Sequence, residues 1–86
     1  MAEQLLGQVT HYFSKAKVAG LKITEGKLVV GDTIHIVGHT SDFSQKIESM
    51  QMEHAPVETA KAGDEVGIRV VEHAREHDKV YRVLPD

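Results

Sequence analysis

Residues 28–36 read Leu-Val-Val-Gly-Asp-Thr-Ile-His-Ile, and this stretch decides the fold class. Valine and isoleucine favour extended backbone because their branched side chains pack well on a pleated surface. The Gly31-Asp32 pair is a turn signal between two extended runs. Beyond it, Ile34 and Ile36 alternate with polar neighbours, so both should face a core while the residues between them face solvent. The stretch therefore predicts two strands joined at a sharp corner.

Short runs of this kind, punctuated by glycine and aspartate, extend along the whole chain. The expected strands are residues 5–13, 18–24, 28–30, 33–38, 43–53, 65–71 and 79–84. The run 65–71 is the clearest, since Val66, Ile68 and Val70 alternate with an outward Arg69. This alternation is typical of strands with one face on a core.

Two places interrupt the pattern. A bulge is expected near Ser49, where the apolar spacing slips, and Pro56 should end the strand expected at residues 43–53. Residues 57–61 are expected to form a single helical turn or a loop. Turns that recur roughly every 8–12 residues, without a sustained helical period, favour a barrel or a sandwich. The chain is therefore predicted to be one all-β domain, residues 1–86.

Composition narrows the class of protein. Cysteine is absent, which excludes disulfides, thiolate nucleophiles and cysteine-ligated metals. No signal peptide is expected at the start, so the cytoplasm is the expected location. The net charge of −3 argues against tight, sequence-independent binding to nucleic acid. Protonation of the six histidines would reverse that sign, so binding to an anionic partner should depend on pH between about 5 and 7.

Several motifs follow one another in a fixed order. They are residues 28–36, the run Ile47-Glu48-Ser49-Met50-Gln51, the run 60–68 with its Ala62-Gly63-Asp64 turn, the opening Gly7-Gln8-Val9 and the closing Asp78-Lys79-Val80. Together they resemble domain II of the translational GTPases, the elongation factor Tu and initiation factor 2 group. The resemblance implies a small closed Greek-key β-barrel of six to seven strands. It is strongest to short stand-alone translation elongation factor-like proteins, and the same barrel forms the C-terminal part of some U32 peptidase-like proteins.

Catalytic, cofactor and metal sites are not expected. The sequence between Gly20 and Gly26 does not match a phosphate-binding loop, because five residues separate the two glycines and the motif has four. GTP binding by this chain alone is therefore not expected. No serine lies in a nucleophile motif. The histidines His35, His39 and His54 could share one face, which leaves a metal site open beside the simpler interpretation of solvated surface.

Candidate binding residues come from two regions. By resemblance, Gln51 and His54 stand where domain II of elongation factor Tu uses an acidic residue and an arginine to hold the 3′ end of aminoacylated tRNA. The first hairpin, with His11, Tyr12, Phe13, Lys15 and Lys17, combines aromatic and basic side chains that suit stacking on bases and contact with phosphate. The same residues equally suit a solvated turn with Tyr12 or Phe13 in the core. The candidate set is Tyr12, Lys15, Lys17, Gln51, His54 and Arg69.

Two functions remain open. One is a translation-associated binding module that contacts tRNA, ribosomal RNA or the ribosome. The other is a protein–protein accessory domain, docking onto a larger enzyme such as a U32 peptidase-like protein or pairing with itself through exposed strand edges. Neither function requires a reactive group in the chain.

Overall fold

The computed structural model describes residues 2–84, which contain strands, turns and loops but no helix. The strands are β1 Ala2–Phe13, β2 Val18–Ile23, β3 Lys27–Val29, β4 Thr33–Val37, β5 Asp42–Lys46, β6 Met50–Met52, β7 Ala55–Val57, β8 Thr59–Lys61, β9 Glu65–Arg69 and β10 Lys79–Leu84. No helix long and apolar enough to cross a membrane is found in this range. The predicted all-β class is confirmed.

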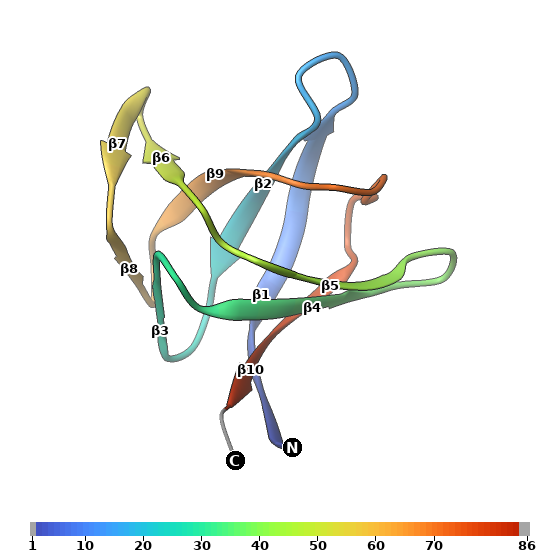
Figure 1. The fold of residues 1–86 in the computed structure, drawn as a ribbon, viewed down its shortest axis with the longest axis horizontal. Coiled ribbons are helices and arrows are strands. Elements are labelled where there is room, and N and C mark those ends of the chain that lie inside the picture. The colour runs from blue at the N-terminus through green and yellow to red at the C-terminus, as the bar shows by residue number, and fades with distance from the viewer. Residues whose placement is uncertain (1, 85–86) are drawn as a thin grey trace.

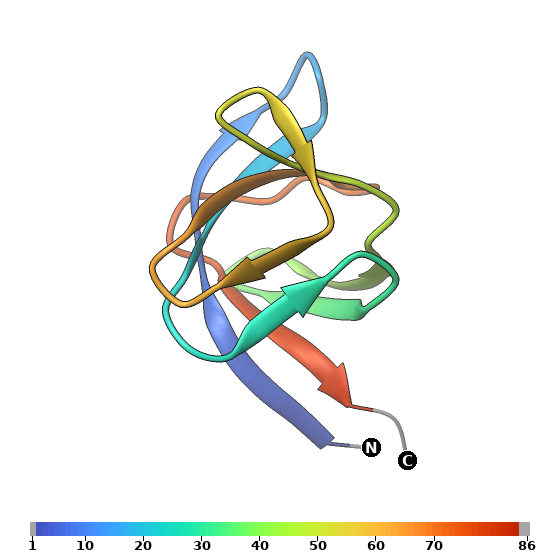
Figure 2. The same ribbon diagram turned by 90° about the vertical axis from the view of Figure 1, so that its left-hand side faces the viewer.

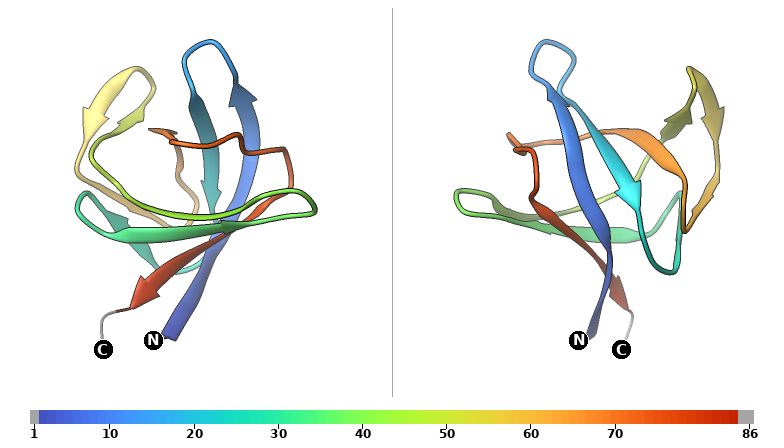
Figure 3. Two further views of the ribbon diagram at one scale, coloured as in Figure 1. Left: turned by 45° about the vertical axis from the view of Figure 1, so that its right-hand side comes forward. Right: turned by 180° about the vertical axis from the view of Figure 1, so that it is seen from behind.

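The strands form one large curved sheet and one small one. The large sheet has eight strands in the order β5-β4-β10-β1-β2-β9-β6-β7, and β3 pairs with β8. In Figure 1, β4 crosses in front of β1, and the reverse view in Figure 3 shows the same two layers from behind. Figure 2 shows β3 and β8 side by side across one flank. Neither ladder closes into a ring, so the predicted closed barrel of six to seven strands is not confirmed.

An aliphatic core fills the space between the layers. Ile34, Ile36 and Ile68 are each no more than 1% exposed, in agreement with the predicted alternation. Of the two aromatic residues that could complete the core, Tyr12 packs against it and Phe13 is 56% exposed. The core residues are Leu6, Val9, Ala19, Leu21, Ile23, Leu28, Ile34, Ile36, Phe43, Ile47, Met50, Ala60, Val66, Ile68, Val70, Ala74 and Val80.

Three aspartates build three similar corners. Asp32 donates its backbone N–H to the Val29 carbonyl, and its Oδ2 accepts the Val29 N–H, both at 2.9 Å. Asp64 bonds in the same way to Lys61, and Asp78 to Arg75. The two predicted glycine–aspartate turns are therefore confirmed, with the expected capping by the carboxylate.

The third corner differs in the residue before the aspartate. Gly31 and Gly63 take φ of 104° and 97°, whereas the third corner has His77 at φ 73°. A side chain at positive φ is disfavoured by contact between its Cβ and the backbone. His77→Gly should therefore raise the free energy of unfolding by about 0.5–1 kcal/mol, measured by denaturant unfolding. His73→Gly, in the same loop but without positive φ, is the control, and an equal gain in both would contradict the strain at His77.

Three local predictions are corrected by the structure. The expected strand 43–53 is two strands, β5 and β6, because the chain leaves the ladder at residues 47–49 rather than forming a bulge near Ser49. Pro56 does not end a strand but lies in β7, at an edge of the large sheet, where a missing N–H is tolerated. Residues 59–61 are strand β8, not a helical turn or loop.

One side chain ties the β5 edge to the segment after β9. The amide group of Gln45 donates to the Arg69 carbonyl oxygen, and its oxygen accepts the N–H of Val71, both at 2.8 Å. These are the two bonds that a neighbouring strand would otherwise make. We name the line between Gln45 and residues 69–71 the Gln45 seam.

Candidate functional site

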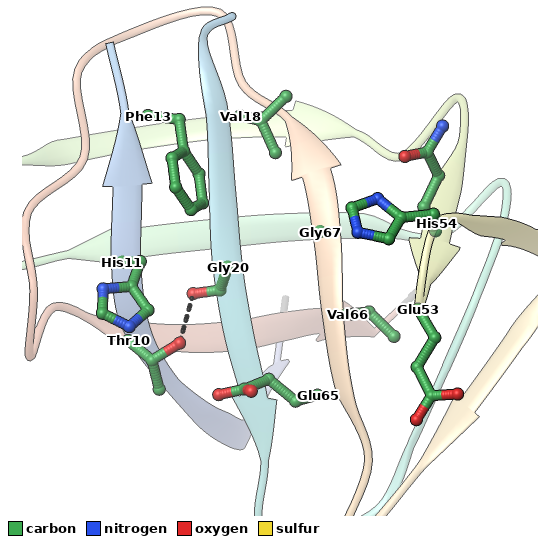
Figure 4. Close-up of a pocket in the computed structure, with 11 residues that line it drawn as sticks. Thr10, His11, Phe13, Val18, Gly20, Glu53, His54, Glu65, Val66 and Gly67 are labelled. Carbon is green, nitrogen blue, oxygen red and sulfur yellow. Dashed lines mark hydrogen bonds between the residues drawn. The ribbon is translucent and has the colours of Figure 1, made fainter.

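A row of four residues crosses the outer face of the large sheet. His11 on β1 lies opposite Gly20 on β2, Gly20 lies opposite Gly67 on β9, and Gly67 lies opposite Gln51 on β6. The two central positions have no side chain. The row therefore has a floor of backbone between two polar walls (Figure 4).

This floor is the base of a hollow of about 340 Å³, here called the glycine hollow. Figure 4 shows Phe13 and Val18 towards one end and Glu53 and Glu65 towards the other. The Thr10 hydroxyl donates to the Gly20 carbonyl at 3.2 Å, so that side chain is held against the strand. The complete lining is Thr10, His11, Phe13, Val18, Gly20, Gln51, Glu53, His54, Glu65, Val66 and Gly67.

A strained turn places two of the lining residues. β6 and β7 pair from Met52 to Ala55, so Glu53 and His54 alone form the loop of the hairpin. Their φ values are 52° and 67°, the pattern of a two-residue turn that normally selects asparagine and glycine. The usual sequence signal for a hairpin is therefore missing, and the hairpin was not predicted.

The predicted candidate residues do not form one site. Gln51 and His54 line the glycine hollow. Arg69 lines an adjoining hollow of about 300 Å³ that shares Gln51 with it. Tyr12 packs against the core with its ring centroid 4.4 Å from that of His73.

The two lysines of the set do not line the glycine hollow. Lys15 and Lys17 belong to the turn between β1 and β2. The prediction missed Glu53 and Glu65 and did not select Phe13. The facing glycines Gly20 and Gly67 were a signal, but their pairing depends on the register of β2 and β9, which the sequence does not give.

A second polar cluster surrounds His35. Its Nδ1 lies 2.8 Å from Glu3 Oε2, and its Nε2 lies 2.5 Å from Asp42 Oδ1. Both ring nitrogens face carboxylate oxygens, so both act as donors when the ring is protonated. The face proposed for His35, His39 and His54 is not formed, because His54 lies in the glycine hollow. Within residues 2–84, no group of three or more His, Cys, Asp or Glu is arranged to hold a metal ion.

The His35 cluster makes stability depend on pH. The hydrogen bond to Asp42 raises the pKa of His35 above 6.5, burial opposes the rise, and Glu3 adds to it. Because the folded-state pKa exceeds the unfolded one, the stabilisation is complete below about pH 6.5 and is lost as pH rises through the folded pKa. Thermal unfolding between about pH 5.5 and 8.5 should detect this loss. His35→Gln should abolish it and His39→Gln, at an exposed position, should not; a profile unchanged by His35→Gln would refute the assignment.

Known proteins similar to this chain include a protease and a collagenase. An uncharacterized protease of Methanocaldococcus jannaschii is 38% identical over 77 residues, which are 88% of this chain and 19% of that protein. A collagenase of Porphyromonas gingivalis is 40% identical over 78 residues, which are 90% of this chain and 22% of that protein. The chain thus spans about a fifth of the length of these relatives.

The fold is also found in a solved structure. The C-terminal domain of a Geobacillus thermoleovorans protein described as a U32 peptidase superposes with a TM-score of 0.86 at 18% identity, covering 94% of this chain and 93% of that one. These relatives are not stand-alone translation factors, so that part of the predicted resemblance is not supported, whereas the domain II-like fold is. Residues 16–80 match the family of elongation factor Tu domain 2. The chain therefore belongs to the elongation factor Tu domain 2 family.

Proposed function

We propose that this chain is a non-catalytic accessory domain that serves a U32 peptidase-like protein through protein–protein contact. The observation that supports this most is the coverage of the relatives: about nine-tenths of this chain aligns with about a fifth of proteins described as a protease and a collagenase. Such a ratio is typical of a module combined with a larger protein. The location we propose remains the cytoplasm.

The chemistry of the glycine hollow supports a binding role. Its two histidines and two glutamates are spread around the glycine floor, and the one side-chain hydrogen bond among its lining residues in the range 2–84 joins Thr10 to a backbone oxygen. No serine or threonine there is held by a base, as nucleophilic catalysis requires. The hollow therefore favours recognition over reaction.

A role in translation is the weaker candidate. Contact with tRNA or ribosomal RNA needs lysine or arginine at the phosphates. None of the eleven residues that line the glycine hollow is a lysine or arginine, and two are glutamates. Lys15, Lys17 and Arg69 lie outside it, so the predicted basic and aromatic surface is divided.

The shape that we propose for the working domain is a closed barrel. The ladders leave edges at β5 and β7, but the Gln45 seam occupies the two backbone groups beside β5. Addition of a partner strand at residues 69–71 would have to displace Gln45. We therefore propose the outer face of the sheet as the docking surface in place of the edge at β5.

Affinity capture from cells at low salt tests the proposed function. The tagged domain should recover the U32 peptidase-like protein of the same organism in stoichiometric amount, identified by mass spectrometry, with little nucleic acid. Binding of the purified pair should then be measured by calorimetry. Recovery of RNA without that protein would contradict the accessory role and favour the role in translation.

A further inference from the structure

Two glycines under the glycine hollow are not required by the fold. The φ values of Gly20 and Gly67 lie outside the left-handed region. A Cβ on Gly67 would come no closer than 3.4 Å to Val18, and one on Gly20 would lie 3.3 Å from the Thr10 hydroxyl oxygen, which would have to shift by a few tenths of an ångström. Glycine weakens a strand because it adds backbone entropy and has no side chain to pack. What both glycines do provide is open space above paired strands.

Two further residues of the hollow have side chains at backbone positions that favour glycine or asparagine. Glu53 and His54 occupy the left-handed positions that asparagine and glycine would fill at lower cost. Two of the four non-glycine residues with positive φ in the described range thus belong to this one turn. Glycines inside strands and side chains at positive φ both lower stability, and residues that lower stability in this way are expected to gather at a functional site.

The hollow is amphipathic along its length. Phe13, with 56% of its surface exposed, and Val18 form an apolar end. The carboxylates of Glu53 and Glu65 lie at the other end in Figure 4, and Gln51 adds a carboxamide to the wall. An extended group with an apolar stem and a cationic tip complements a hollow that is apolar at one end and negatively charged at the other.

We infer that the glycine hollow binds an arginine side chain of the partner polypeptide. The methylene stem packs on Phe13 and Val18, and the guanidinium lies over the glycine floor towards Glu53 and Glu65. A planar guanidinium fits a floor without side chains and can bond two carboxylates at once, which the compact ammonium of lysine does less well. The inference rests on the proposed accessory function, since the arginine belongs to the protein that the domain serves.

The same features disfavour a nucleotide as the occupant. A base could stack on Phe13, but its phosphate would approach the two glutamates without a lysine or arginine among the lining residues. The net charge of −3 adds to that repulsion. A basic peptide is instead attracted both by the two glutamates and by the negative net charge.

Amide NMR of the whole chain tests the arginine site. At about pH 7.5, where free histidine is neutral, the peptide acetyl-Gly-Arg-Gly-amide should shift the Gly20 and Gly67 amides saturably, with a Kd of about 1 mM. The neutral isostere with citrulline should bind at least about fivefold more weakly. The double variant Glu53→Gln, Glu65→Gln should lose affinity to the same extent, whereas Glu58→Gln, at an exposed position between β7 and β8 that does not line the hollow, should not.

Filling the floor provides an independent check. Gly67→Ala should weaken binding of the arginine peptide while the amide spectrum stays dispersed, since its Cβ would come no closer than 3.4 Å to Val18. Absence of saturable shifts, equal binding of citrulline, or tighter binding of adenosine monophosphate would each overturn the arginine site. Such a failure would leave the accessory function to be decided by the capture experiment, which does not depend on this hollow.

Discussion

Alanine at position 7 is expected to lower the free energy of unfolding by about 3 kcal/mol or more. A Cβ on Gly7 would lie 1.8 Å from the carbonyl oxygen of Lys22 and 2.9 Å from its carbonyl carbon. Both atoms are backbone of β2, and Gly7 is paired with Ile23 on that strand and with Val80 on β10. Relief of the clash must therefore move a strand at the centre of the sheet.

The control for this substitution is Gly67→Ala. Its Cβ would be in ordinary contact with Val18 at 3.4 Å, so stability should change by less than about 0.5 kcal/mol. Denaturant unfolding of both variants measures the difference. For a domain of this size, whose total stability is on the order of 5–10 kcal/mol, Gly7→Ala could leave little folded protein. Equal effects at positions 7 and 67 would show that close approach of β1 and β2 does not limit position 7.

Removal of the Gln45 carboxamide is expected to cost about 1–2 kcal/mol. Gln45→Ala deletes a donor and an acceptor together and leaves Arg69 O and Val71 N to solvent. Gln45→Glu keeps an acceptor for Val71 but places a carboxylate against a carbonyl oxygen, so it should not restore stability at neutral pH.

The control for the Gln45 variants is a substitution of Lys46, its exposed neighbour on β5. Lys46→Ala should have little effect on denaturant unfolding, since its side chain is exposed and surface substitutions are usually near neutral. If Gln45→Ala is as mild as Lys46→Ala, the Gln45 seam adds nothing to stability. Full rescue by Gln45→Glu would place the effect in packing and not in the two hydrogen bonds.

The strands that could be predicted are those whose own residues carry the signal. Ile34 and Ile36 alternate with polar residues, and the Gly31-Asp32 corner follows from local chemistry alone. The third corner was missed because His77 occupies a position where glycine is the usual signal. The Gln45 seam could not be predicted either, since it joins residues 24 and 26 positions apart through a side chain.

The site was only partly predictable because it also depends on contacts between residues that are far apart in the sequence. Gln51 and His54 were found through resemblance to domain II, which supplies positions and not contacts. Glu65 became a candidate only when the pairing of β2 with β9 placed it beside the hollow. Lys15 and Lys17 were selected for their charge, which says nothing about the face on which a side chain lies.

The two hydrogen bonds of the Gln45 seam should break before the ladders of the sheet. Ladder bonds along β2 and β9 break only together, whereas the Gln45 pair can break while both strands stay intact. The N–H of Val71 should then exchange with deuterium through brief local opening, and the N–H of Leu21 only on global unfolding. The domain would thus open locally at the Gln45 seam while its core stays packed.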